Sequence, residues 1–282
     1  MAIRQLAVIG TGTMGRGIAY LSAVAGYDTV IHDIDQAALD AARASVDSML
    51  RKAVEKGRLT DGAAAEAAAR VQVASDLEPA VRAADLIIEA VPESFDLKKD
   101  LFAQADLYCS AETILVSNTS SISITKLASN VERRDRFAGL HFFNPPHAMK
   151  LIEIVRGERT SDETIEQLRE VAARMGKEPI VVRDSPGFAT SRLGVAIGLE
   201  AIRMLQEGVA SAEDIDRAME LGYNHPMGPL RLSDLVGLDV RLGVAEYLAS
   251  TLGERFEPPQ LLRDKVAAGK LGRKTGQGFY RW

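Results

Sequence analysis

Histidine side chains are the natural candidates for moving a proton near neutral pH, because the ordinary pKa of an imidazole lies in that range. The chain has four of them: His32, His141, His147 and His225. His141 follows the short apolar segment 136–140, and Glu153 lies in the next one, 150–155. If both segments are neighbouring strands, the carboxylate can reach the imidazole, fix its tautomer and stabilise its charged form. We therefore predict that His141 and Glu153 form a general acid/base pair.

The remaining histidines are weaker candidates for the base, although one stays a rival. His147 lies only six residues beyond His141 and could take its place. His32 lies at the end of an earlier apolar segment, away from the expected reaction centre, and His225 lies in a proline-flanked turn. An isolated histidine near a strand is often a structural residue, so the choice stays open at this point. No HxxH, HExxH or CxxC spacing occurs, so the sequence predicts no metal site.

A glycine-rich turn near the start of the chain is typical of dinucleotide binding. The apolar run 6–9 leads into Gly10-Thr11-Gly12-Thr13-Met14-Gly15, and a helical pattern follows. In such a turn the first glycine makes the bend, the second lets the backbone approach a pyrophosphate, and the third lets helix pack on strand. The N–H groups at the helix start then bind the negative charge. We expect the following residues to hold the cofactor: Gly10, Gly12, Thr13, Met14 and Gly15.

An acidic residue at the end of the second apolar segment indicates which dinucleotide is bound. Residues 29–32 read as a strand that ends on Asp33, 18 residues beyond Gly15. A carboxylate there can accept hydrogen bonds from a ribose diol but would repel a 2′-phosphate, which favours NAD over NADP. The competing phosphate-binding loop, GxxxxGK[ST], is absent, since Gly272-Arg273-Lys274-Thr275 has the wrong order.

The elements that must position these residues predict two domains. Residues 37–70 read as two helices that break near 56–57 and 61–62. Further apolar runs read as strands, mainly buried and parallel: 85–91, 114–116, 136–140, 150–155 and 179–182. From Pro186-Gly187 onward only helical patterns occur. We predict an α/β fold with a Rossmann-like, doubly wound, mainly parallel sheet over 1–184, followed by an all-α domain over 185–282.

Composition excludes several other classes of protein. The chain has 282 residues with 46% hydrophobic content, which suits about two globular domains. Its 34 basic and 39 acidic residues give a net charge of -5 without a Lys/Arg-rich run, so we expect no nucleic acid partner. No apolar stretch has the length of a membrane span or signal peptide, so we expect no membrane partner. A single cysteine, Cys109, excludes an internal disulfide and fits a reducing, cytoplasmic location.

Five segments together carry a resemblance over nearly the whole chain. They are Ser117-Asn118-Thr119-Ser120-Ser121, Gly139-Leu140-His141-Phe142-Phe143-Asn144-Pro145, Asp184-Ser185-Pro186-Gly187-Phe188, His225-Pro226-Met227-Gly228-Pro229 and Gly272-Arg273-Lys274-Thr275-Gly276-Gln277-Gly278-Phe279-Tyr280. In this combination and order they resemble the 3-hydroxyacyl-CoA dehydrogenase family, of its single-function 3-hydroxybutyryl-CoA type. The resemblance implies a Rossmann-like domain followed by a helical domain that borders the substrate cleft and forms a homodimer.

The resemblance also implies roles for individual residues. The histidine of its GLHFFNP motif is the catalytic acid/base, here His141, and the glutamate that orients it is Glu153. Ser120 and Asn144 are expected beside both the substrate and the nicotinamide. Residues expected to touch the dinucleotide are Glu93, Lys98 and Lys274, and a candidate for the CoA phosphates is Lys56.

One position departs from the family pattern. Where the family usually has Gly-Phe-x-x-Asn-Arg, this chain has Gly187-Phe188-Ala189-Thr190-Ser191-Arg192. A serine hydroxyl reaches less far than an asparagine amide, so a contact of Ser191 with the substrate oxygen would pass through water or be lost. The fold is unaffected, whereas the rate and the preferred acyl chain are open.

The reaction that these expectations support is the NAD-dependent, reversible oxidation of an (S)-3-hydroxyacyl-CoA to a 3-oxoacyl-CoA. A short acyl chain such as 3-hydroxybutyryl is expected, and a dicarboxylic acyl-CoA is equally compatible with the sequence. Two alternatives remain: a related dehydrogenase of a free hydroxy acid, and a non-catalytic NAD-binding or structural protein. Turnover without any CoA thioester would select the first, and tight NAD binding without turnover would select the second.

Overall fold

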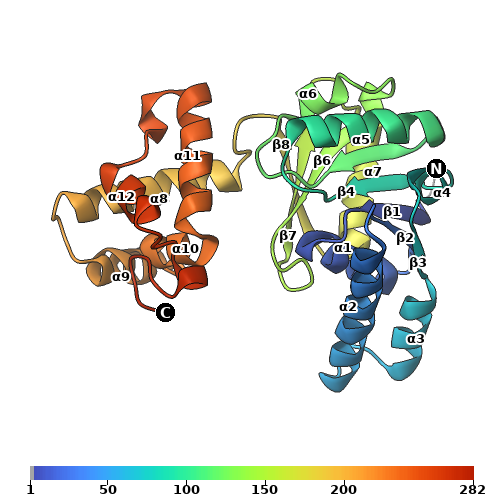
Figure 1. Cartoon of the computed structure of the whole chain (residues 1–282), viewed down its shortest axis with the longest axis horizontal. Coiled ribbons are helices and arrows are strands. Elements are labelled where there is room, and N and C mark those ends of the chain that lie inside the picture. The colour runs from blue at the N-terminus through green and yellow to red at the C-terminus, as the bar shows by residue number, and fades with distance from the viewer. Residues whose placement is uncertain (1–2) are drawn as a thin grey trace. The chain divides into compact units, whose positions relative to one another are not determined.

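The computed structural model describes residues 3–282, which divide into two units, one ending at Ser185 and the other running from Pro186 to Trp282 (Figure 1). This division falls one residue beyond the boundary predicted from the sequence. Each unit has its own apolar core.

The first unit contains one eight-stranded sheet, ordered β3-β2-β1-β4-β5-β6-β7-β8 (Figure 1). The strands are β1 Gln5–Ile9, β2 Asp28–His32, β3 Val71–Ala74, β4 Leu86–Glu89, β5 Ile114–Ser117, β6 Phe137–Phe142, β7 Leu151–Arg156 and β8 Glu178–Arg183. Every neighbouring pair is parallel except β6 and β7, which are antiparallel. The predicted doubly wound, mainly parallel sheet is therefore confirmed. The short strand β3 was not expected from the sequence. Two of its four residues are exposed, so it has no continuous apolar run that would predict a buried strand.

Helices connect the parallel strands and cover the sheet. They are α1 Thr13–Val24, α2 Gln36–Glu55, α3 Asp61–Ala69, α4 Leu77–Val81, α5 Phe95–Tyr108, α6 Ile124–Ala128 and α7 Asp162–Arg174. One large core contains alternate strand residues, such as Leu6 and Val8, together with Ile18 of α1 and Leu168 of α7. This alternation is what a sheet with helices on both faces requires. The connections place the carboxyl ends of β1, β4 and β5 at one edge, where ligands of such sheets bind.

The second unit is helical, as predicted. It consists of α8 Thr190–Gln206, α9 Ala212–Tyr223, α10 Pro229–Val236, α11 Leu238–Leu252 and α12 Gln260–Ala267. A 3₁₀ turn, Glu254–Phe256, lies between α11 and α12, and another, Arg273–Thr275, follows α12. Its core includes Leu199, Leu230 and Leu248. The buried carboxylate of Asp234 accepts hydrogen bonds from the backbone of the C-terminal segment and from the Trp282 indole, which fixes the chain end on α10. Within residues 3–282, every helix is too short or too polar to cross a bilayer.

Candidate active site

The glycine turn after β1 has the geometry that the sequence predicts. Gly10 adopts a φ of 101°, and a Cβ there would lie 2.7 Å from the carbonyl carbon and oxygen of Ala90. A Cβ at Gly15 would lie 1.8 Å from the carbonyl oxygen of Gly10. Any larger residue at either position would collide with backbone, so both glycines are needed for the turn itself.

The start of α1 is open to a ligand. A Cβ placed on Gly12 would meet no heavy atom of the described residues within 4 Å. Gly12 is also the N-cap of α1, and no side chain within residues 3–282 caps it. Thr13 and Met14 follow as the first residues of the helix. Uncapped N–H groups and the helix dipole make this end suitable for an anion such as a pyrophosphate. The residues present therefore fit a dinucleotide.

Asp33 lies at the end of β2, next to this turn. Its Oδ2 accepts hydrogen bonds from the Thr11 N–H (2.9 Å) and the Thr11 hydroxyl (2.6 Å). Burial by itself raises the pKa of the Asp33 carboxyl, but the hydrogen bonds from Thr11 and the following backbone outweigh it, so the pKa is lowered. Asp33 is thus held ionised, which the predicted contact with a ribose requires.

His141 and Glu153 are hydrogen-bonded to each other. They lie directly opposite in the antiparallel pair of β6 and β7, and the His141 Nδ1 to Glu153 Oε2 distance is 2.7 Å. Glu153 is fully buried and His141 is 7% exposed. The sequence placed His141 just after a strand, whereas β6 continues to Phe142, because the ladder with β7 extends over these residues. The pairing that joins the two side chains is therefore set by strand register.

A pocket of about 340 Å³ lies at the carboxyl ends of β1, β4, β5 and β6, a volume in the range of small-molecule sites. Its lining residues all belong to the first unit: Met14, Ala90, Val91, Glu93, Lys98, Asn118, Ser120, His141, Phe142, Phe143 and Asn144. The structure thus brings together six residues that the sequence analysis assigned to the site, from the glycine turn to the histidine. What each of them binds remains a prediction.

Three other predicted site residues lie elsewhere in the chain. Lys56 is the exposed C-cap residue of α2. Ser191 lies in the first turn of α8 and Lys274 in a 3₁₀ turn of the second unit, where its ammonium is 2.6 Å from Asp239 Oδ2. Their expected contacts with substrate or cofactor stay predictions.

The rival base, His147, is not among the described residues that line this pocket. Its ring meets that of Tyr20 edge-on, with centroids 6.2 Å apart. Burial lowers the pKa of His147, and the positive charges of Lys177, Arg58 and Lys56 lower it further. This histidine is surrounded by cations, whereas His141 is paired with a carboxylate.

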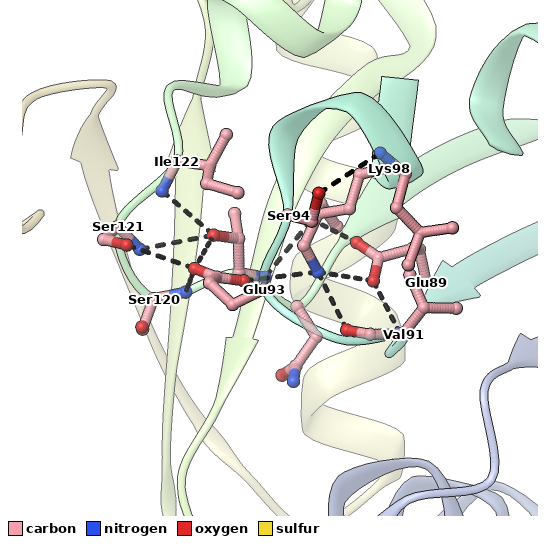
Figure 2. A network of polar contacts seen from close by, with 12 residues as sticks. Glu89, Val91, Glu93, Ser94, Lys98, Ser120, Ser121 and Ile122 are labelled. Atoms are coloured by element: carbon pink, nitrogen blue, oxygen red, sulfur yellow. Dashed lines mark hydrogen bonds and ion pairs between the residues drawn. The ribbon is translucent and has the colours of Figure 1, made fainter. Parts of the chain in front are cut away.

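A polar network surrounds the buried Glu89, which the sequence did not predict (Figure 2). Glu89 ends β4, and its carboxylate accepts from Lys98, Ser117 and the Val91 N–H. The signal was present, because a charged residue inside the apolar run 85–91 must find partners. Asn118 was also missed, and its Oδ1 accepts from the Phe142 N–H at 2.9 Å, which fixes the backbone beside His141.

The fold and these geometric features define the class of proteins that bind a dinucleotide at the edge of a Rossmann-like sheet. Residues 5–185 match the family described as "3-hydroxyacyl-CoA dehydrogenase, NAD binding domain". Residues 187–282 match the "3-hydroxyacyl-CoA dehydrogenase, C-terminal domain". The chain belongs to the 3-hydroxyacyl-CoA dehydrogenase family. The predicted family, the enzyme class of NAD-dependent oxidoreductases and the cofactor NAD are confirmed.

Individual relatives cover 99% or more of this chain. It is 45% identical over 279 residues to a "Probable 3-hydroxybutyryl-CoA dehydrogenase" of Deinococcus radiodurans, with 99% of this chain and 100% of the relative covered. It is 42% identical to a "3-hydroxyadipyl-CoA dehydrogenase" of Escherichia coli, covering 99% of this chain and 59% of that longer protein. The crystal structure of (S)-3-hydroxybutyryl-CoA dehydrogenase from Ralstonia eutropha superposes with a TM-score of 0.96 at 44% identity, covering 100% of this chain and 99% of that one.

Proposed function

We propose that this enzyme oxidises a short-chain (S)-3-hydroxyacyl-CoA, such as 3-hydroxybutyryl-CoA, reversibly to the 3-oxoacyl-CoA. The observation that carries the proposal is the buried His141–Glu153 pair, whose imidazole lines the same pocket as Met14 of the glycine turn. This arrangement suits removal of a hydroxyl proton next to a dinucleotide. The names of the relatives from Deinococcus radiodurans and Ralstonia eutropha support the same substrate class.

In the proposed mechanism, His141 takes the proton of the C3 hydroxyl. Its Nδ1 is held by Glu153, so proton exchange with the substrate falls to Nε2. Glu153 is fully buried and stabilises the imidazolium that forms. General-base catalysis of this kind typically contributes about 10²–10⁴-fold. NAD, when bound, supplies the acceptor for the hydride from C3.

Hydrogen-bond donors near His141 are proposed to hold the substrate oxygen. Ser120 and Asn144 line the pocket with His141, and the hydroxyl of Ser191 is the proposed contribution of α8. Donors aimed at an oxygen where negative charge develops are typically worth about 3 kcal/mol each. Lys56 is proposed for the CoA phosphates.

The cofactor contacts are proposed from the motif positions. The pyrophosphate would lie on the N–H groups of the turn Gly10–Gly15, with Thr13 and Met14 at the helix start, and the adenosine ribose on Asp33. Glu93, Lys98 and Lys274 are the further residues proposed to face the dinucleotide.

We also propose that the enzyme acts in the cytoplasm as a homodimer joined through its helical unit, without a nucleic acid or membrane partner. The helical unit exposes large apolar side chains that a second copy could cover: Leu193, Ile197, Leu221 and Tyr223. Light scattering on the purified protein would give twice the 30.4 kDa of one chain, and a single-chain mass would contradict the dimer.

One assay tests the substrate and separates the alternatives. Reduced-nicotinamide absorbance would be followed with acetoacetyl-CoA, longer 3-oxoacyl-CoAs, a dicarboxylic 3-oxoacyl-CoA and a free oxo acid, each with NADH and NADPH. The proposal expects turnover of acetoacetyl-CoA with NADH. Turnover only of the dicarboxylic thioester would move the substrate to the class named for the Escherichia coli relative. Turnover of the free acid would remove CoA from the proposal, and NADH binding without any turnover would contradict catalysis.

A further inference from the structure

Glu89 is a buried carboxylate without a role in the mechanism above, and both of its oxygens are engaged. Its Oε1 accepts from the Lys98 ammonium at 2.5 Å and from the Val91 N–H at 2.7 Å. Its Oε2 accepts from the Ser117 hydroxyl at 2.6 Å. Glu89 is fully buried at the end of β4, so its carboxylate binds groups of the protein interior and does not face a ligand.

Lys98 lies on α5 and is also buried, with 1% of its surface exposed. Its ammonium has three acceptors, which are Glu89 Oε1, the Val91 carbonyl at 3.2 Å and Glu93 Oε2 at 3.3 Å. An ammonium group has three hydrogens to donate. The contacts within this chain are therefore enough to hold Lys98 in one place.

Glu93 connects this buried pair to the loop that carries Ser120 (Figure 2). Its Oε2 faces Lys98. Its Oε1 accepts from the Thr119 hydroxyl at 2.5 Å, the Ser120 N–H at 3.3 Å and the Ser121 hydroxyl at 3.1 Å. The two oxygens of one carboxylate thus join the α5 side of the network to the loop after β5.

We propose that Glu89 is a positioning residue, which acts through Lys98 and Glu93 to fix the backbone of Ser120 at the pocket wall. The importance of this placement for catalysis rests on the proposed function, in which Ser120 holds the substrate oxygen. The placement itself is a property of the network.

The physical reason is the division of one positive charge between two carboxylates. Burial raises the pKa of Glu89, and the Lys98 charge with the hydrogen bonds from Lys98, Ser117 and Val91 opposes that rise. While Glu89 is ionised, Lys98 is shared between it and Glu93. If Glu89 lost its charge, the attraction of Lys98 for Glu93 would be undivided. Glu93 would then move toward Lys98 and release the N–H of Ser120, because a buried ammonium without a carboxylate beside it is costly in free energy.

The test variant is Glu89→Gln. Glutamine keeps the size of the side chain and can accept from Lys98 and Val91. Its amide would donate to the Ser117 hydroxyl, so the charge is lost and the direction of this one hydrogen bond is reversed. The matched control is Asp85→Asn, at the opposite end of β4, where the carboxylate accepts from the Arg4 and Gln5 N–H groups. Asp85 directly precedes β4 and Glu89 ends it, so each variant removes one carboxylate from an end of this strand, but only Glu89 is connected to the Ser120 loop.

The primary readout is amide hydrogen exchange of residues 118–122 in the full chain. Glu89→Gln is expected to accelerate exchange of this segment about tenfold, the factor for losing one hydrogen bond to a charged acceptor, while Asp85→Asn leaves it as in the wild type. The second readout compares the change in kcat with the change in the Kd for NADH. Glu89→Gln should lower kcat with acetoacetyl-CoA about tenfold and change the Kd for NADH by less than about threefold.

Wild-type exchange rates in a folded Glu89→Gln variant would overturn the proposal, and so would equal acceleration by Asp85→Asn. An equal loss of NADH affinity would also overturn it, because Glu89 would then act through the cofactor contacts proposed for Glu93 and Lys98 and not through Ser120. If Glu89→Gln does not fold, the double variant Glu89→Gln/Lys98→Met removes the buried pair together. Because no ammonium then draws Glu93 away, exchange of residues 118–122 must stay close to the wild-type rate, and about tenfold faster exchange would overturn the proposal. A wild type inactive on every 3-oxoacyl-CoA would reject the proposed function, while the exchange data would still decide the role of Glu89.

Discussion

Replacing Glu153 by glutamine isolates the charge of the carboxylate that holds His141. The side chain is fully buried, and its Oε2 lies 2.7 Å from His141 Nδ1. A glutamine oxygen can accept the same hydrogen bond, so the ring keeps its orientation while the negative charge is lost. The variant therefore separates electrostatic stabilisation of the imidazolium from positioning of the ring.

The expected loss can be bracketed from this geometry. Two unit charges about 4 Å apart at an effective dielectric constant of about 20 attract by about 4 kcal/mol, which corresponds to about 10³ in rate. A hydrogen bond to a charged group is worth at least about 1.5 kcal/mol, or about tenfold. Because burial places Glu153 toward the stronger limit, we expect kcat to fall by about 10²–10³-fold.

The assay is initial-rate kinetics with 3-hydroxybutyryl-CoA and NAD, together with NADH binding and thermal unfolding. The matched control is Glu178→Gln, at the exposed start of the neighbouring strand β8, which should leave kcat unchanged. Affinity for NADH should also stay unchanged in the Glu153→Gln variant. A folded Glu153→Gln variant with kcat within about threefold of wild type would refute the assignment of Glu153 as the stabilising charge.

Three further predictions test other parts of the account. His147→Gln should leave kcat within about threefold of wild type. Burial and nearby cations lower the pKa of His147 in the folded protein, so below about pH 6.5 the unfolded state binds more protons than the folded state. The free energy of unfolding, measured with a chemical denaturant at a series of pH values, should therefore fall more on acidification for the wild type than for this variant. A crippled His147→Gln enzyme would instead make His147 the base. Ser191→Asn should change kcat/KM by about tenfold or more across acyl lengths without changing the Kd for NADH, and equal constants would remove Ser191 from the substrate site. Asp33→Ala should narrow the preference for NADH over NADPH by about tenfold or more, as the ratio of kcat/KM values, and an unchanged ratio would separate Asp33 from the ribose.

Local signals in the sequence were enough for the cofactor turn. Gly15 is required by the carbonyl oxygen of Gly10 earlier in the same turn, and Asp33 closes the same βαβ unit. The close approach of Ala90 to Gly10 is a contact between distant parts of the sequence and became visible only in the structure. The His141–Glu153 pair was also within reach, because two adjacent apolar segments place the residues opposite each other once they pair as antiparallel strands. The residues of the glycine turn motif, and those of the His141–Glu153 pair, lie close to one another in the sequence, which is why both could be predicted from it.

The Glu89 network was not predicted because Glu89 and its side-chain partners Lys98 and Ser117 come from three separate elements. Glu89 lies on β4, Lys98 on α5 and Ser117 on β5, and periodicity shows only that Glu89 interrupts an apolar run. Which side chain neutralises a buried charge depends on packing between elements and not on spacing in the sequence. For the same reason, the sequence did not predict the hydrogen bond that the Phe142 N–H donates to Asn118 Oδ1.

The central claim is that His141, held by Glu153, exchanges the proton of the substrate oxygen. A crystal structure of the enzyme with NAD and acetoacetyl-CoA measures it most directly. The account predicts His141 Nε2 within about 2.6–3.2 Å of the C3 oxygen, on the side of the nicotinamide. A C3 oxygen beyond the reach of His141, with His147 or another side chain in its place, would contradict it.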